Sequence, residues 1–462
     1  MSATYNLPLV ITHLILEYAS TVNKRNLTLA WKHSLKLLAV CQEWRAIGKC
    51  VVYRTAYLIE ETPDEPDDKT EITNIDLIKS VNFAHLVRTV FVIATNEMCL
   101  GTFILTHKTI FESDKYDWTR VNCFDMTVSE YVDKRNALLI DEPSYELAPD
   151  NSFADYFAAT MPNVVSVSFN INPVTNKTTA LCSRIINGYG GQLRSIYNNC
   201  VTNFTAFTSQ SFLANLTHLD IKLDSVVESI LPKINPAALF HLKMWNVPLH
   251  FSWDYFSQNQ SSNIIVFNRL KVLFLSFVDE TVSSNVIHTN IQAGSNNIIG
   301  RHYVRFPKLD YLTIINNPGT QLLSAHYTFP EVIWSVTISK SLNTIQLVKE
   351  SNIKEIKSLV LYVDNIGQES ESEFYRLTNH YFNSKTRVSR SRICLERTHF
   401  PLDFNRINWT NLTQIHLREV IDIHHITSLL ANMSELTRLS VGFFRVDSFS
   451  EFISDAVYNT DH

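Results

Sequence analysis

A short apolar pattern that returns at a nearly constant interval constrains the fold of this chain more than any other feature. The pattern is apolar-x-x-apolar-x-apolar, as in Leu216, Leu219 and Ile221. The alternation at its end predicts a short strand with its apolar side chains on one face. Copies starting at 193, 216 and 239 lie 23 residues apart, and those at 309, 333 and 356 lie 24 and 23 apart. Further copies start at 270, 412 and 436.

One such unit cannot bury its apolar face alone, whereas stacked neighbours bury it together. We therefore expect positions one, four and six of each copy to face a core and the intervening positions to face outward. Polar stretches near 281–300 and 364–392 interrupt the interval and are expected to be inserts in outer loops. An ordinary α/β domain with strands at this spacing is the alternative interpretation.

The N-terminal segment has a different periodicity. Residues 7–58 carry apolar side chains at helical spacing and predict a small helical module. The stretch 60–71 follows with seven acidic residues, two prolines and one lysine, which predicts a solvated linker or, alternatively, an acidic docking motif. The expected organisation is a helical module over 1–58, a linker or loop over 59–80, and a repeat region over 81–462 that is clearest from 160 on.

Composition and motifs exclude several classes of protein. The net charge of −5 and the pI near 6.3 argue against a dedicated nucleic-acid binder. Seven scattered cysteines without C-x-x-C spacing fit a reducing compartment. The sequence contains no run of about 18 apolar residues, so no membrane span is predicted. With only 10 glycines and no P-loop, G-x-G-x-x-G, G-x-S-x-G or H-E-x-x-H motif, the sequence indicates no metal, no cofactor and no catalytic residue. An enzyme with a dispersed site is the remaining catalytic hypothesis.

Two resemblances carry the prediction further. From about residue 160 the repeats resemble the leucine-rich-repeat family, although the family's Asn after the strand is matched only at Asn317. The N-terminal segment resembles an F-box, which opens on Leu-Pro and closes on Val-Cys-x-x-Trp-Arg. The residues that carry this resemblance are Leu7, Pro8, Ile11, Ile15, Leu16, Leu37, Val40, Cys41, Trp44 and Arg45.

The predicted fold class is thus α/β, a small N-terminal F-box-like helical module followed by an irregular leucine-rich-repeat-like α/β solenoid. The resemblance implies the substrate-recognition subunit of an SCF-type ubiquitin ligase, located in the cytoplasm, the nucleus or both. The F-box residues would dock on a Skp-type adaptor, and through it on a cullin, while the solenoid binds a substrate protein. The alternative is a repeat scaffold for protein binding without a ligase. No nucleic acid or membrane partner is expected.

The repeat pattern also predicts which side chains would meet the substrate. Outward-facing strand positions would line the inner face of a solenoid, and aromatic residues with arginine are the usual anchors of protein interfaces. Trp245, Phe274 and Tyr311, on successive copies, would form an apolar patch flanked by charge. The full candidate set is Tyr197, Lys222, Lys243, Trp245, Phe274, Tyr311, Tyr362, Arg418 and Arg438.

Overall fold

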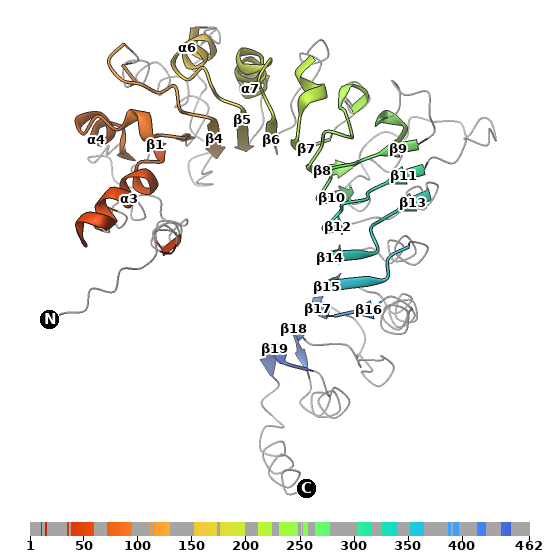
Figure 1. Ribbon diagram of the computed structural model, residues 1–462. Helices are drawn as coiled ribbons and strands as arrows, with labels where there is room; N and C mark the ends of the chain where they lie inside the picture. Colours follow the sequence, from red (N-terminus) through yellow and green to blue (C-terminus); the bar gives the residue numbers. More distant parts are fainter. Residues whose placement is uncertain are drawn as a thin grey trace, which may run out of the picture. The chain divides into compact units, whose positions relative to one another are not determined.

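A computed structural model of the chain separates it into two compact units, Met1–Leu216 and Thr217–His462 (Figure 1). The described chain is mixed α/β and built on a mostly parallel sheet with few helices, so the predicted α/β class is confirmed; the described α-helices belong to the N-terminal unit. The described residues are 11, 14–15, 35–36, 38–59, 72–94, 111–112, 114–129, 152–172, 176–198, 211–223, 231–247, 251, 253–256, 264–277, 303–315, 326–339, 352–364, 387–389, 391–396, 414–421 and 436–444.

The N-terminal unit has a sheet with strand order β6-β5-β4-β3-β1-β2, in which only the β1–β2 pair is antiparallel. Its strands are β1 (Thr55–Ile59), β2 (Ile72–Thr73), β3 (Thr89–Ala94), β4 (Cys123–Ser129), β5 (Ser166–Asn172) and β6 (Ser195–Asn198). Its helices are α3 (Gln42–Val52), α4 (Ile75–Ser80), α6 (Ser152–Thr160) and α7 (Asn176–Tyr189), with 3-10 turns η1 (Ala84–Leu86) and η3 (Ser211–Asn215).

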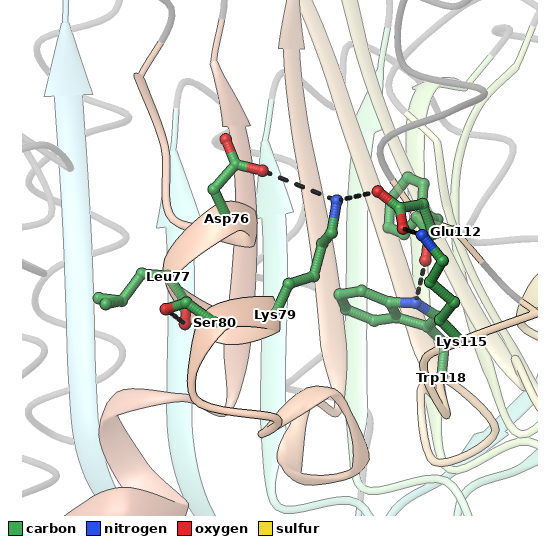
Figure 2. A network of polar contacts seen from close by, with 8 residues as sticks. Asp76, Leu77, Lys79, Ser80, Glu112, Lys115 and Trp118 are labelled. Carbon is green, nitrogen blue, oxygen red and sulfur yellow. Dashed lines mark hydrogen bonds and ion pairs between the residues drawn. The ribbon is translucent and has the colours of Figure 1, made fainter.

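A polar network ties α4 to the segment that precedes β4 (Figure 2). Lys79 Nζ lies 2.9 Å from Glu112 Oε1 and 3.8 Å from Asp76, and Lys115 Nζ lies 2.8 Å from Glu112 Oε2. The hydrogen bonds from Lys115 and Lys79 lower the pKa of Glu112 to about 2. Nearby, the buried Trp118 indole donates a 2.7 Å hydrogen bond to the Phe111 carbonyl. The network therefore joins two segments more than thirty residues apart.

The C-terminal unit has a parallel sheet with strand order β19-β18-β17-β15-β14-β12-β10-β8-β7, and β16 pairs with β15. Its strands are β7 (His218–Lys222), β8 (His241–Val247), β10 (Val272–Phe277), β12 (Tyr311–Ile315), β14 (Val332–Ser339), β15 (Glu355–Asp364), β16 (Arg387–Val388), β17 (Ser391–Glu396), β18 (Gln414–Ile421) and β19 (Arg438–Phe444). The connections contain the 3-10 turns η4 (Leu231–Lys233) and η5 (Trp253–Phe256).

The apolar pattern sets the register of this sheet. Its fourth positions lie opposite one another on neighbouring strands and are buried, because every strand presents the same face to the core. The first and sixth positions of these copies are buried as well, so the predicted burial is confirmed for them. This row of fourth positions consists of Leu219, Leu242, Leu273, Leu312, Val336 and Leu359.

A second, three-stranded parallel sheet, which the sequence analysis did not predict, lies in the connections of the C-terminal unit. It is formed by β9 (Ile264–Val266), β11 (Tyr303–Arg305) and β13 (His326–Thr328), beside the main sheet in Figure 1. The residue that follows each strand is a buried phenylalanine. The rings of Phe267 and Phe306 stack at 5.1 Å and those of Phe306 and Phe329 at 5.6 Å, which makes a continuous aromatic column.

Three predicted boundaries differ from the structure. The module boundary at 58 falls inside β1, which pairs with β3, so the sheet begins before the expected repeat region. Residues 72–80, assigned to the linker, form β2 and α4, because Ile75 and Ile78 bury a helical face there. The end of the predicted insert 364–392 forms β16 and the start of β17. The acidic stretch 60–71 and the insert 281–300 lie outside the described residues.

Candidate functional site

The second face of the C-terminal sheet, defined as the side opposite the buried fourth positions, carries the candidate binding residues. On β7 the half-exposed side chains are His218, Asp220 and Lys222, and on β8 they include His241, Lys243 and Trp245. Alternation along each strand places them there, since successive side chains of a strand point to opposite faces. The half-exposed pattern continues into β10, where Phe274 is opposite Lys243.

Four of these residues form a connected cluster. The Trp245 indole donates a 2.8 Å hydrogen bond to Asp220 Oδ1, and Lys243 Nζ lies 3.7 Å from Asp220 Oδ2. The rings of Trp245 and Phe274 lie 4.3 Å apart, and Lys243 Nζ lies 5.8 Å from the centre of the Phe274 ring. The cluster thus joins a carboxylate, an ammonium group and two aromatic rings. Three of the predicted substrate-binding residues, Lys243, Trp245 and Phe274, are brought together in it.

A β-bulge next to the cluster sets the position of Trp245. Met244 lies opposite Leu275 and Val247 opposite Phe277, so two residues of β8 face one residue of β10. Asn246, the second residue of the bulge, has φ of 53°, a left-handed conformation in which Asn is enriched. The Trp245 carbonyl still accepts a 2.7 Å hydrogen bond from Leu223 N on the other side. Trp245 is therefore held from its backbone as well as from its ring.

The electrostatics of the cluster follow from partial burial. Desolvation raises the pKa of Asp220, while the hydrogen bond from Trp245 and the charge of Lys243 oppose that rise. His218 and His241 stack with ring centres 6.0 Å apart. Desolvation, together with the charge of Lys243 and the neighbouring His218, lowers the pKa of His241 to about 4. Desolvation also lowers the pKa of His218, so both imidazoles are neutral at neutral pH.

The other predicted substrate-binding residues lie apart from this cluster. Tyr311 is 49% exposed, and its partners in register are Val272 and Ser335. Phe274 is instead opposite Thr313, so Tyr311 lies two residues along the strand from the partner of Phe274. Tyr362 is exposed near the end of β15. Arg438 is exposed at the start of β19, and Arg418 belongs to β18. Lys222 is the exception, because it lies opposite the cluster residue Trp245 in register, and Tyr197 belongs to the N-terminal unit.

Trp334 is a strong candidate that the sequence analysis missed. It is 59% exposed on β14, next to the paired residues Tyr311 and Ser335. It stands at position two of its repeat, whereas the nine residues of the candidate set stand at positions three, five or seven of theirs. A large aromatic side chain directly after a repeat's first apolar residue was the signal that could have identified it.

The N-terminal unit holds the residues predicted to bind an adaptor. Ile11 and Ile15 are exposed, as is Val40, and Trp44 is half-buried in α3. The Cys41 sulfur caps α3 by accepting from Trp44 N at 3.4 Å. The Arg45 side chain donates to the Leu38 carbonyl at 3.1 Å. The remaining predicted adaptor residues, Leu7, Pro8, Leu16 and Leu37, lie outside the described residues.

The described parts of the chain suggest no metal centre, since no three His, Cys, Asp or Glu side chains gather there. In the same parts, no helix is both long and apolar enough to cross a membrane. No protein-family model matches the sequence, and no curated protein matches it significantly. What the site offers chemically is a binding surface of aromatic and charged side chains on a rigid sheet.

Proposed function

We propose that this chain is a non-catalytic, protein-binding subunit that recruits a substrate protein to an SCF-type ubiquitin ligase. In this proposal the parallel strands belong to an irregular leucine-rich-repeat-like solenoid that binds the substrate. The N-terminal segment is an F-box-like helical module that docks on a Skp-type adaptor and through it on a cullin. Ubiquitin transfer would follow from proximity, with the chemistry supplied by other subunits.

The observation that carries the substrate-binding half is the cluster of Asp220, Lys243, Trp245 and Phe274. Tryptophan and tyrosine dominate the energetics of protein interfaces, and here a tryptophan is held on a sheet by a hydrogen bond and a bulge. A side chain fixed before binding loses less entropy when a partner is bound. Exposed Tyr311 and Trp334 on nearby strands extend the aromatic surface available to a partner.

The adaptor-binding half rests on the motif residues and on their exposure. Ile11, Leu14 and Ile15 are 42%, 55% and 39% exposed, and Val40 at the start of the Val-Cys-x-x-Trp-Arg motif is 59% exposed. Complete burial of such a side chain is worth about 1.5–3 kcal/mol, of which the exposed fraction is still to be gained. Three of these side chains fall within five residues, and together with Val40 they favour a partner that covers them.

Co-purification of the full chain with a Skp-type adaptor tests this proposal. The variant Leu7→Asp/Pro8→Ala/Ile11→Asp should lose the adaptor while keeping the circular dichroism spectrum of the wild type. The control is Val332→Asp, which places an aspartate on an exposed apolar residue of β14 and should keep the adaptor. Binding that survives in the triple variant contradicts docking through the F-box-like residues. A wild-type chain that fails to bind the adaptor leaves the protein as a repeat scaffold without a ligase.

A further inference from the structure

The sheet of the N-terminal unit carries a row of side chains that the proposed function does not use. Tyr57, Phe91, Asp125, Ser168 and Tyr197 lie opposite one another in register on β1, β3, β4, β5 and β6. All five are half-buried, and they lie on the face opposite the buried apolar residues of the same strands. The row therefore sets one carboxylate among three aromatic rings.

The neighbours of Asp125 on this face are uncharged or titrate outside the neutral range. The Ser168 hydroxyl hydrogen-bonds to the carboxylate from one side, and Phe91 lies on the other, in edge contact with Tyr57 at 6.1 Å. Along β4 the flanking residues on the face are Cys123, whose thiol has a pKa raised by burial, and Thr127. The small side chain of Ser168 separates Asp125 from Tyr197.

Within the described residues no cation accompanies this carboxylate. The ion pairs found among the described residues of this unit join Lys79 and Lys115 to Asp76 and Glu112, on the α4 side. The Arg88 guanidinium donates to the His85 and Val87 carbonyls instead. Burial accordingly raises the pKa of Asp125 to about 6, with the hydrogen bond from Ser168 opposing the rise. At neutral pH a carboxylate is thus held partly desolvated and lacks an ionic partner in the part of the unit that is described.

We infer that Asp125, with Phe91 on one side and Tyr197 beyond Ser168 on the other, binds a lysine or arginine side chain of the partner protein. The carboxylate supplies a charge-assisted hydrogen bond, and the aromatic rings attract the same cation through their faces. A divalent metal ion is a poorer occupant, because the neighbouring hydroxyl and aromatic groups offer it no second carboxylate or imidazole. This inference rests on the part of the proposed function in which the sheet binds a protein, and it specifies a basic segment in that protein.

Fluorescence anisotropy with dye-labelled decapeptides tests the inference on the full chain. The probes are (Ser-Lys)5 and (Ser-Arg)5, with (Ser-Glu)5 as the charge-reversed control. We expect Asp125→Asn to weaken the basic peptides roughly tenfold, the equivalent of about 1.4 kcal/mol. Asp114→Asn, which removes the same charge from an exposed turn of the same unit, should leave their affinity unchanged. Wild-type affinity should also fall at pH 5, where Asp125 is protonated.

A second variant keeps the test decisive if Asp125→Asn folds poorly. Phe91→Leu keeps every charge and removes one ring, and it should weaken the basic peptides by about two- to fivefold. Equal losses in Asp125→Asn and Asp114→Asn, equal binding of (Ser-Glu)5, or no binding by the wild type would each overturn the inference. A chain that binds the adaptor but not the basic peptides overturns this inference alone, whereas the reverse result overturns adaptor docking alone.

Discussion

The indole of Trp245 on β8 donates a 2.8 Å hydrogen bond to the carboxylate of Asp220 on the neighbouring strand β7. Lys243 lies opposite Asp220 in register, and its Nζ lies 3.7 Å from Oδ2 of the same carboxylate. Burial raises the pKa of Asp220, and the hydrogen bond from Trp245 and the charge of Lys243 oppose that rise. This pair therefore couples the aromatic part of the candidate surface to its charged part.

Replacing Trp245 by Phe should destabilise the C-terminal unit by about 1–2 kcal/mol, because a partly buried carboxylate loses a donor. Asp220→Asn in the same chain should recover part of that loss, since a neutral amide needs less solvation. Urea unfolding of the wild type, both single variants and the double variant measures the coupling, which we expect to be at least about 0.5 kcal/mol. Simple additivity of the two single effects would show that the hydrogen bond contributes nothing to stability.

The strands were predictable because their information is local. In copies such as Leu216, Leu219 and Ile221, alternating side chains fix both the element and its buried face, and the structure keeps both. Register beyond residue 364 was not predictable in the same way. Leu361 on β15, a sixth position, lies opposite Ile393 on β17. Ile393 in turn lies opposite Ile415 on β18, which is a fourth position of its copy. The unrecognised strand β17 between them shifts the alignment by two residues.

Side-chain contacts between strands were harder to predict from the sequence than the strands themselves. The sequence places Trp245, Phe274 and Tyr311 on one face, but only the first two rings meet. Tyr311 lies apart because its partner on β10 is Val272, two residues from Phe274, while the bulge at Asn246 beside Trp245 has no signature in the apolar pattern. The column of Phe267, Phe306 and Phe329 was missed for a related reason. These residues stand three or four positions before the repeat, outside the pattern that identified it.

Removing the ring of Phe306, the central residue of that column, should lower the stability of the C-terminal unit. Phe306 is fully buried, stacks on Phe267 and Phe329, and meets Trp253 edge-on at 5.7 Å. Phe306→Ala should destabilise the C-terminal unit by about 3–5 kcal/mol, with Phe306→Leu less severe. The control Tyr303→Ala removes an exposed ring from the same sheet and should cost much less. Thermal unfolding would decide the point, since comparable shifts for Phe306→Ala and Tyr303→Ala would contradict a structural role for the column.

Replacing Asn74 should also destabilise the chain, in this case through lost hydrogen bonds. Its buried side chain accepts from Tyr57 N at 2.8 Å and donates to the Thr55 carbonyl at 2.9 Å, so the amide acts as a strand partner for β1. Asn74→Ala leaves both backbone groups without this partner and should cost about 2–3 kcal/mol. Asn74→Asp, which has nearly the same shape, cannot donate to the carbonyl and should also destabilise. Hydrogen exchange at the Tyr57 amide reports the effect directly, and unchanged protection in Asn74→Ala would exclude it.

The stability of the N-terminal unit should fall between pH 4 and pH 7 because of Asp125. Its pKa of about 6 in the folded chain lies above the ordinary value of 3.8, so the folded state binds this proton more tightly. That contribution is complete below 3.8 and is lost as the pH rises through 6. After a reduction for the partial exposure of the carboxylate, the difference between these two pKa values corresponds to about 1–2 kcal/mol of unfolding free energy. Asp125→Asn should remove this slope and raise stability at pH 7.5.

Urea midpoints of the wild type, Asp125→Asn and Asp114→Asn, measured from pH 4 to 7.5, isolate this effect from other titrating groups. His241, with a pKa of about 4, and Asp220 contribute equally to all three chains, so the difference between chains belongs to the replaced residue. Asp114→Asn should follow the wild type across the range. If Asp125→Asn followed it too, the carboxylate would already be paired in the folded chain, and the site inferred for a basic side chain would be occupied from within.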